Sequence, residues 1–374
     1  EHPHPRGRDP KGEADFAAIR LVCALYEPVC YDKLTEDVKA SIKHFFLEHD
    51  YRSVYGSENH ALMFRAARFL AAQFYEGEEF VSYGLTAQEC YVQDMEYLHE
   101  FMDFRARRGW GEFDSLGYGR EIVLILATLH KYAADERMRR KCHMALDVVL
   151  LDMIADSLGE LYAGAHGRSY PNAVLDRTEA GMVKLYRYYF GGRFYDGKEI
   201  NSVNIYLSDY VPSPIVYEIV QNKKVPYENR EKKHLHLMSA WKEEIDKEAL
   251  SKEQGSINKY TYVCEDYAIG SVNCQEDYNP LIIEKDRLYA RHQQHEWELT
   301  LPGGGEHKIF SHHCGLADEH KINNRWTGDN RCCCGSYYTN HNTAIAMYNI
   351  DNRDKLPLIN AFVPLEIFRE KLLE

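Results

Sequence analysis

Hydrophobic residues recur every three or four positions through much of the first 250 residues. A period near 3.6 residues gathers such side chains on one face of an α-helix, so the pattern predicts several amphipathic helices. The repeating residues are Leu62, Ala66, Phe69, Leu70 and Phe74 in one stretch, Ile122, Ile125, Leu126 and Leu129 in another, and Met144, Val148, Leu151 and Ile154 in a third.

Polar or glycine-rich segments separate these helical stretches, the longest at 107–119 and 159–172. Helices that alternate with long, polar loops are typical of helical hairpins packed in a ring, in which the loops share one rim. The pattern therefore predicts an (α/α) toroid domain over residues 14–250. Residues 1–13 are polar and carry three prolines, which predicts a tail in front of it.

The hydrophobic pattern changes near residue 255. Short segments rich in Val, Ile, Tyr and Thr follow one another there, and Gly, Asn and Asp separate them, which predicts antiparallel strands. These segments are 257–272, 295–302, 307–313 and 343–350. A charged run at 228–250 predicts a helix that ends the first region. The expected fold class is α+β, in which an antiparallel β-sandwich-type domain occupies 251–374. Its end at a charged helical run indicates that this domain is incomplete.

Composition and charge narrow the classes of function. The chain has 374 residues, of which 45% are hydrophobic, enough for a large core. Its formal net charge of −13 opposes general binding to nucleic acid. Because of this charge we expect no nucleic-acid partner. No apolar run approaches the length of a membrane span, so we expect no membrane partner either.

Ten cysteines are scattered along the chain without the spacing of a small disulfide framework. Buried free thiols favour a reducing, cytoplasmic compartment. No signal peptide is visible, so a secreted protein would require that a leader was removed. The consecutive cysteines 332–334 lack the paired spacing of a zinc knuckle.

Histidines are concentrated in the predicted strand region, and together with one aspartate they are candidate metal ligands. Their spacing matches no compact ligand motif, so a structural zinc or other divalent metal and histidines that face a groove are both compatible with the pattern. We expect that the function requires no cofactor. The residues are His292, His295, His312, His313, Asp318 and His320.

Three polar residues, Glu58, Asn59 and His60, lie on the first turn of the apolar helix predicted within residues 55–77. Ser57 or Asn59 is a candidate helix cap. Capping does not account for an amide and an imidazole side by side. The amide of Asn59 can donate two hydrogen bonds to a carboxylate, and His60 can exchange a proton near neutral pH. A structural role for His60 remains the alternative.

Two further polar groups lie in the glycine-rich loops. In the first loop, Gly117 and Gly119 flank Tyr118 and permit unusual backbone angles that present its phenol outward. In the second loop, the guanidinium of Arg168 suits a bidentate grip on a carboxylate. An ordinary turn with a helix cap at Asp114 or Ser115, and an ordinary surface arginine, are the alternatives. The candidate residues are Glu112, Asp114, Tyr118 and Arg120 in the first loop, and His166, Arg168 and Tyr170 in the second.

The order of these groups resembles that in the α/α-toroid polysaccharide lyases, the heparinase II/III-like and alginate-lyase families. Asn59 and His60 share one helix, and Tyr118 follows Asn59 by 59 residues in a polar loop. The resemblance implies a helical toroid joined to an antiparallel β-sandwich. It also implies that the asparagine or its neighbouring histidine neutralises a uronate carboxylate, while the tyrosine transfers the proton.

The implied activity is β-elimination in a uronate-containing polysaccharide or oligosaccharide, an acidic substrate. Tyr118 would act as base and acid, with His60 as the alternative base, and Asn59 would grip the carboxylate with the help of Arg120 or Arg168. A free phenol has a pKa of about 10, so we expect Arg120 or protonated His60 to lower the pKa of Tyr118. The remaining candidates for substrate contact are Glu58, Glu112, His166 and Tyr170.

Two other functions fit the same residues. A glycoside hydrolase requires two carboxyl groups on either side of the scissile bond, and Glu58, Glu112 and Asp114 are candidates for them. A non-catalytic carbohydrate-binding protein requires aromatic surfaces for stacking on sugars, and the chain contains 28 Tyr and four Trp.

Overall fold

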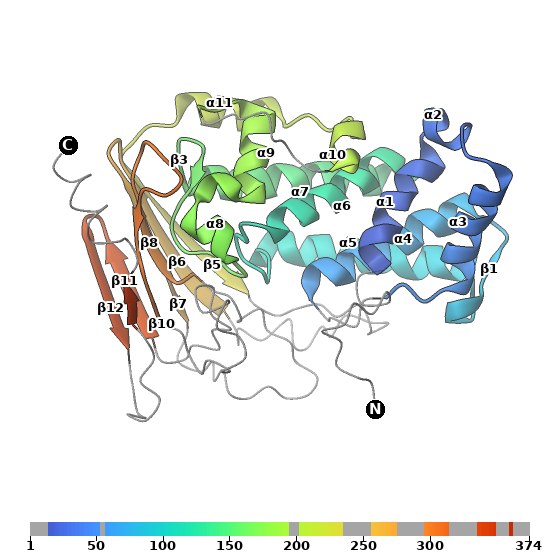
Figure 1. Cartoon of the computed structure of the whole chain (residues 1–374), viewed down its shortest axis with the longest axis horizontal. Coiled ribbons are helices and arrows are strands. Elements are labelled where there is room, and N and C mark those ends of the chain that lie inside the picture. The colour runs from blue at the N-terminus through green and yellow to red at the C-terminus, as the bar shows by residue number, and fades with distance from the viewer. Residues whose placement is uncertain are drawn as a thin grey trace.

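The computed structural model combines helices with small antiparallel sheets, which confirms the α+β fold class (Figure 1). Helices fill the N-terminal two thirds of the chain, and strands follow them. The tail at 1–13, cysteines 332–334 and the charged run at the C-terminus lie outside the described residues. The structure describes residues 14–52, 57–193, 202–234, 256–274, 295–313, 335–348 and 359–361.

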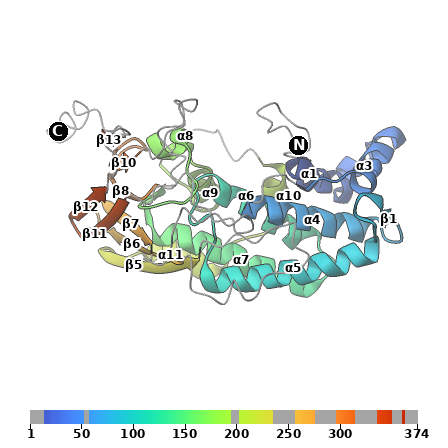
Figure 2. The same ribbon diagram turned by 90° about the horizontal axis from the view of Figure 1, so that it is seen from below.

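Two helical hairpins form the centre of the helical part. The first joins α4 to α5 and the second joins α6 to α7, and they lie side by side because α4 contacts α6 while α5 contacts α7. Figure 2 shows α4 and α6 in one layer, with α5 and α7 beneath them. None of the helices described here is long and apolar enough to cross a bilayer. The helices are α1 Ala14–Tyr26, α2 Pro28–Tyr31, α3 Glu36–Glu48, α4 Glu58–Phe74, α5 Ala87–Arg108, α6 Tyr118–Tyr132, α7 Glu136–Ala155, α8 Pro171–Leu175, α9 Gly181–Phe190, α10 Val203–Leu207 and α11 Pro214–Asn222, with 3₁₀ turns at Val81–Tyr83 and Arg177–Glu179.

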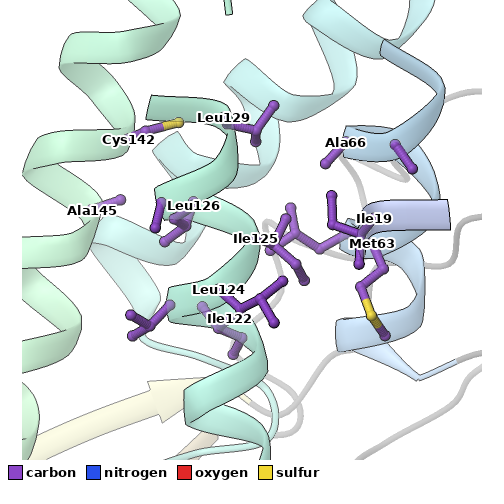
Figure 3. Packing of buried hydrophobic residues seen from close by; sticks show 14 of the residues in the cluster. Ile19, Met63, Ala66, Ile122, Leu124, Ile125, Leu126, Leu129, Cys142 and Ala145 are labelled. Atoms are coloured by element: carbon purple, nitrogen blue, oxygen red, sulfur yellow. The ribbon is translucent and has the colours of Figure 1, made fainter. Parts of the chain in front are cut away.

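The hydrophobic core surrounds α4 and α6. Figure 3 shows α6 between Ile19 and Met63 on one side and Cys142 on the other. The predicted apolar face of α6 is buried, and so is that of α4 apart from Phe74, which is half-buried, so both predictions are confirmed. Burial on α4 is wider than one face, because every residue from Glu58 to Ala72 is buried.

On α7 the predicted apolar face is displaced. Met144, which the period predicts to face the core, is 58% exposed. The buried side chains nearest to it on α7 lie one and two positions away, at Ala145 and Cys142. Apolar residues are so frequent on α7 that neighbouring stripes share the same spacing, and the period alone does not choose between them. The core-facing residues of α7 are Met138, Cys142, Ala145, Leu146, Val149, Leu150, Met153 and Ile154.

Five antiparallel strands form the main sheet, in the order β5-β6-β7-β8-β9. Each pairs with its neighbour along the chain, as hairpins do. The strand predictions within 257–272, 295–302, 307–313 and 343–350 are confirmed. The strands of this sheet are β5 Tyr227–His234, β6 Ser256–Val263, β7 Ala268–Cys274, β8 Trp297–Thr300 and β9 Lys308–Ile309. Smaller pairs are β1 Glu79–Phe80 with β2 Leu85–Thr86, β3 Ser157–Leu158 with β4 Leu161–Tyr162, β10 Ser311–His313 with β13 Ile359–Ala361, and β11 Gly335–Asn340 with β12 Thr343–Tyr348.

The helix predicted at 228–250 is wrong where the structure describes this segment. Residues 227–234 form β5, which pairs with β6 along its whole length. Charge suggested a solvated helix, but strand geometry turns alternate side chains to opposite faces. Lys233 points inward and is buried, whereas the neighbouring Lys232 is exposed. Residues 235–250 lie outside the described residues.

The two faces of the main sheet have different neighbours. One face meets the loops of the helical part, which Lys233 and Lys259 reach with buried side chains. On the other face the β11–β12 hairpin contacts β7, and the hydroxyls of Ser271 and Thr339 are 2.9 Å apart. These contacts join side chains rather than strand edges, so the hairpin forms a second layer over part of the sheet.

Close backbone approach fixes the sheet against the helical part at two glycines. A methyl group on Gly270 would lie 2.8 Å from the carbonyl oxygen of Tyr260 and 3.0 Å from Cα of Gly164. Gly164 itself has a φ of 79°, in the left-handed region that favours glycine. The loop that carries Arg168 therefore lies directly on the sheet.

We expect Gly270→Ala to lower the free energy of unfolding by about 1–3 kcal/mol, because the added methyl group overpacks this contact. Urea denaturation followed by circular dichroism measures the change. Gly117→Ala is the matched control, since a methyl group there meets no atom within 4 Å. Equal stability of the two variants would contradict the close approach.

Candidate active site

The polar first turn of α4 holds the loop that follows α5. Asn59 Nδ2 donates a hydrogen bond of 2.7 Å to Glu112 Oε2. Glu58 forms a buried ion pair with Arg105 of α5, and it accepts a hydrogen bond of 3.1 Å from the backbone N–H of Glu112. Ser57 is the N-cap residue but makes no side-chain capping bond. The polar run at the start of an apolar helix is therefore a platform for the loop.

The two glycine-rich loops are bonded to each other. The N–H of Gly167 donates to the carbonyl of Phe113 at 2.7 Å, and Ser115 Oγ donates to the carbonyl of Arg168 at 2.9 Å. Ser115 Oγ also accepts from the N–H of Tyr118, the first residue of α6, at 3.0 Å. The N-cap position of α6 is Gly117, so neither Asp114 nor Ser115 occupies it. The loops therefore act as one unit.

Arg168 joins the buried platform to the two phenols. Its guanidinium forms an ion pair with Glu112, and Nη2 donates to Tyr118 Oη at 3.3 Å. The guanidinium also lies 4.1 Å from the centroid of the Tyr118 ring, within cation–π range. The hydroxyls of Tyr118 and Tyr170 are 2.9 Å apart. A continuous chain of contacts thus runs from Asn59 through Glu112 and Arg168 to Tyr118 and Tyr170.

Burial decreases along this chain. Asn59 and Glu112 are buried, the side chain of Arg168 is 11% exposed, and both tyrosines are half-buried. A ligand would therefore meet the phenols and the outer edge of the guanidinium, while the amide and the carboxylate hold them from behind.

Two residues of the loops adopt strained backbone angles. Asp114 has a φ of 48° and Arg168 a φ of 45°, although neither is a glycine. Such conformations cost on the order of 1–3 kcal/mol each and persist where surrounding contacts enforce them, often at functional sites. Arg168 is part of the chain of contacts described above, and Asp114 lies beside it in the same loop as Glu112.

The pKa of Tyr118 is raised rather than lowered. Burial favours the neutral phenol, and the positive charge of Arg168 opposes this effect. The expectation that Arg120 or His60 provides the cation is wrong, because Arg168 occupies that place.

Neither His60 nor Arg120 joins the described chain of contacts. His60 Nδ1 lies 2.6 Å from Asp15 Oδ2 of α1, and its ring meets Phe16 edge-on. Successive residues on a helix point about 100° apart, so His60 faces α1 while Asn59 faces the loop. For the same reason Arg120 points away from Tyr118, and its guanidinium pairs with Glu121.

His166 lies beneath the site rather than at its surface, so the structure corrects its expected role in substrate contact. It is buried, and burial holds its pKa well below the usual range, so the ring is neutral. Nδ1 lies 2.9 Å from the carbonyl oxygen of Asp114 and must carry the proton to donate to it. His166 therefore supports the strained backbone at Asp114.

A buried ionic cluster connects the first loop to the sheet. Asp114 is bound by Lys233 of β5 at 2.6 Å and by Lys259 of β6, which also contacts Asp156. The two ammonium groups hold the pKa of the Asp114 carboxyl well below its usual range, despite burial. Oxygens of Asp114, Asp156 and Glu231 lie close enough together to ligate a metal, but the ammonium of Lys259 already contacts two of these carboxylates.

Among the candidate metal ligands of the strand region, His295 is the one whose side chain is described. Its Nε2 lies 2.8 Å from Glu298 Oε2, and Glu298 also pairs with Arg177, so the imidazole belongs to a buried ionic group. The side chains of His312 and His313 lie outside the described set, as do His292, Asp318 and His320. A structural metal in the strand region stays a prediction.

Comparison with known proteins gave no match: no family model fits the chain, and no curated protein and no solved structure is significantly similar to it.

Sequence reasoning missed the groups that hold the site from behind. Arg105 pairs with Glu58, and Lys233 and Lys259 pair with Asp114. The charged run around Lys233 predicts a solvated helix and gives no sign of a buried face. For Lys259 the predicted strand is a signal, because one face of a strand in a sheet is usually buried.

We expect Lys259→Met to lower the free energy of unfolding by about 3–5 kcal/mol, because Asp114 and Asp156 would keep their buried charges without this partner. Lys184→Met is the control, since the pair that Lys184 forms with Glu179 is exposed and contributes little. Chemical denaturation of both variants measures the difference. A Lys259→Met protein as stable as the control would show that the cluster does not stabilise the fold.

Proposed function

We propose that the protein is a polysaccharide lyase that cleaves a uronate-containing polysaccharide or oligosaccharide by β-elimination. One observation carries the proposal: Tyr118 Oη lies within hydrogen-bonding distance of both Arg168 and Tyr170 at the solvent-facing end of the chain of contacts. A phenol beside a fixed cation suits the removal of a proton next to a carboxylate.

The proposed reaction begins with the proton on the carbon beside the uronate carboxylate. That proton is weakly acidic, because its removal adds negative charge to a group that is already an anion. Arg168 stabilises this charge more in the transition state than in the ground state, which is what accelerates the step. A donor of this kind contributes roughly 3–4 kcal/mol, by analogy with an oxyanion-hole donor.

Tyr118 is the proposed base and acid. Its phenolate oxygen takes the proton, and the electron pair of the broken C–H bond forms a carbon–carbon double bond in the sugar ring. The bond from the next ring carbon to the glycosidic oxygen breaks, and that oxygen takes the proton from Tyr118. Tyr170 donates to the phenolate and stabilises it. No group outside the protein and its substrate is consumed.

Asn59 and Glu112 act through Arg168 in this proposal. Asn59 is buried and already donates to Glu112, so the direct grip on the carboxylate passes to Arg168. Glu112 fixes one edge of the guanidinium and leaves Nη2 at the phenol. His60, which faces Asp15, has no part in this scheme.

The contacts of the three carboxylates favour the lyase over a glycoside hydrolase. Glu58 pairs with Arg105, Glu112 with Arg168, and Asp114 with two lysines. Burial raises the pKa of Glu58 to about 7, in the range of a general acid, but Glu58 is fully buried beneath the loop. A hydrolase needs two carboxyl groups that reach the sugar from opposite sides.

The architecture is part of the proposal. The side-by-side hairpins α4–α5 and α6–α7 are the arrangement from which an (α/α) toroid is built. The β11–β12 hairpin stacked on the main sheet is the beginning of a second layer, as in a β-sandwich. We extend both observations to a toroid followed by a sandwich, with the proposed site where the loops of the one meet the sheet of the other.

Tyr118→Phe is expected to lower kcat on polyuronates by about 10²–10⁴-fold, because positioned proton transfer contributes that much. The assay follows the ultraviolet absorbance of the double bond conjugated to the carboxylate. Tyr188→Phe, on the exposed face of α9, is the matched control and should keep full activity. New reducing ends without the absorbance would indicate a hydrolase instead, and a Tyr118→Phe enzyme that keeps most of its activity would rule out Tyr118 as the base.

Arg168→Met is expected to move the rising alkaline limb of the pH–rate profile to higher pH. The guanidinium lowers the pKa of Tyr118, so its loss raises that pKa, and a higher pH is then needed to form the phenolate. Arg168→Lys should give an intermediate position. Circular dichroism at each pH confirms that the variants are folded, and an unchanged limb in Arg168→Met would contradict the role of Arg168.

A further inference from the structure

A groove of about 470 Å³ lies between the main sheet and the β11–β12 hairpin. This volume falls within the range of about 300–1,000 Å³ that is usual for small-molecule sites. Its lining combines polar groups with the apolar surface of aromatic rings. The residues that line it include Arg230, Lys232, Asn258 and Tyr260 of the sheet and Tyr337–Asn340 of β11.

The groove lies on the face of the sheet away from the candidate active site. Strand residues alternate between the two faces, so Arg230 and Lys232 of β5 point opposite to Lys233, which binds Asp114. Arg230 is paired across the ladder with Tyr260 of β6, and their side chains share this outer face. The groove is thus separate from the site around Tyr118.

Hydrogen bonds hold the phenol of Tyr260 in place. Tyr260 Oη donates to Glu228 and accepts from the N–H of His341, both at 3.3 Å. Tyr338 is 54% exposed and alternates with the buried Tyr337 and Thr339, so its phenol lies on the outer face of the hairpin, away from the sheet. A phenol held by its hydroxyl presents a rigid aromatic face at a low cost in conformational entropy, which suits stacking against the C–H face of a sugar ring.

A cation completes the arrangement. The side chain of Arg230 is 73% exposed, and Nε and Nη2 both donate to the same oxygen of Glu228. Its guanidinium carries five N–H donors, so further donors remain for a ligand carboxylate. The planar amide of Asn258 provides donors and an acceptor for hydroxyl groups.

We infer that this groove is a second saccharide-binding site, distinct from the Tyr118 site, which binds a segment of an acidic polysaccharide. The aromatic face of Tyr260 and the amide of Asn258 point to a sugar, and Arg230 points to a sugar that carries a carboxylate. The choice of an acidic polymer also rests on the proposed function. The site would hold a long chain on the enzyme while another part of that chain is cleaved.

The test measures binding without turnover, by affinity electrophoresis in gels that contain alginate, a polyuronate, or dextran, a neutral glucan. All variants are made in the Tyr118→Phe background. Tyr260→Ala is expected to weaken alginate binding about tenfold, and Arg230→Gln should weaken it and reduce its dependence on salt. Tyr188→Ala on α9 is the exposed control and should bind as the parent does.

The second measurement uses enzyme with Tyr118 intact. Tyr260→Ala should slow cleavage of long alginate and leave cleavage of a short oligouronate unchanged, because a short chain does not span both sites. Alginate binding that is equal in Tyr260→Ala and in the parent would overturn the inference, and dextran binding as tight as alginate binding would overturn its acidic part. If alginate in the gel slows migration of the protein but the enzyme with Tyr118 intact forms no unsaturated product, the proposed lyase activity is refuted and the inferred binding site is not.

Discussion

The buried contact of Asp114 with Lys233 and Lys259 is the constraint on which the rest of the structure depends. Desolvation makes an unpaired charge in this position prohibitively costly, so the carboxylate and the two ammonium groups must come together as the chain folds. Asp114 comes from the loop before α6, and the lysines come from β5 and β6. The cluster therefore determines where the sheet docks on the helices.

The proposed site inherits its geometry from this docking. The backbone at Asp114 is strained and accepts a hydrogen bond from His166, while Gly167 of the same second loop donates to Phe113. The sheet thereby holds both loops, and Arg168 is placed between Glu112 and Tyr118 as a result. Catalytic groups fixed in this way need little reorganisation when a ligand binds, which is the condition under which a preorganised charge is effective.

The sequence predicted the parts of this arrangement that depend on local pattern. The helical faces of α4 and α6 follow from their period, and the strands from their composition. The grouping of Glu112, Tyr118 and Arg168 followed from polar residues among glycines. The sequence could not predict which way the His60 side chain points. That depends on which side of α4 packs against α1 and which side against the loop. Likewise β5 was taken for a helix, since charges that are buried against other charges look like solvated ones in a sequence.

The shared role of Asp114 has a consequence for any attempt to divide the protein. A fragment that stops after α11 would contain every residue of the chain from Asn59 to Tyr170 but neither lysine of the sheet. Its carboxylate at position 114 would be open to water, and the left-handed backbone there would lose the contacts that enforce it. Helices and strands are thus parts of one cooperative unit, and the helical part alone is not expected to keep the geometry of the proposed site.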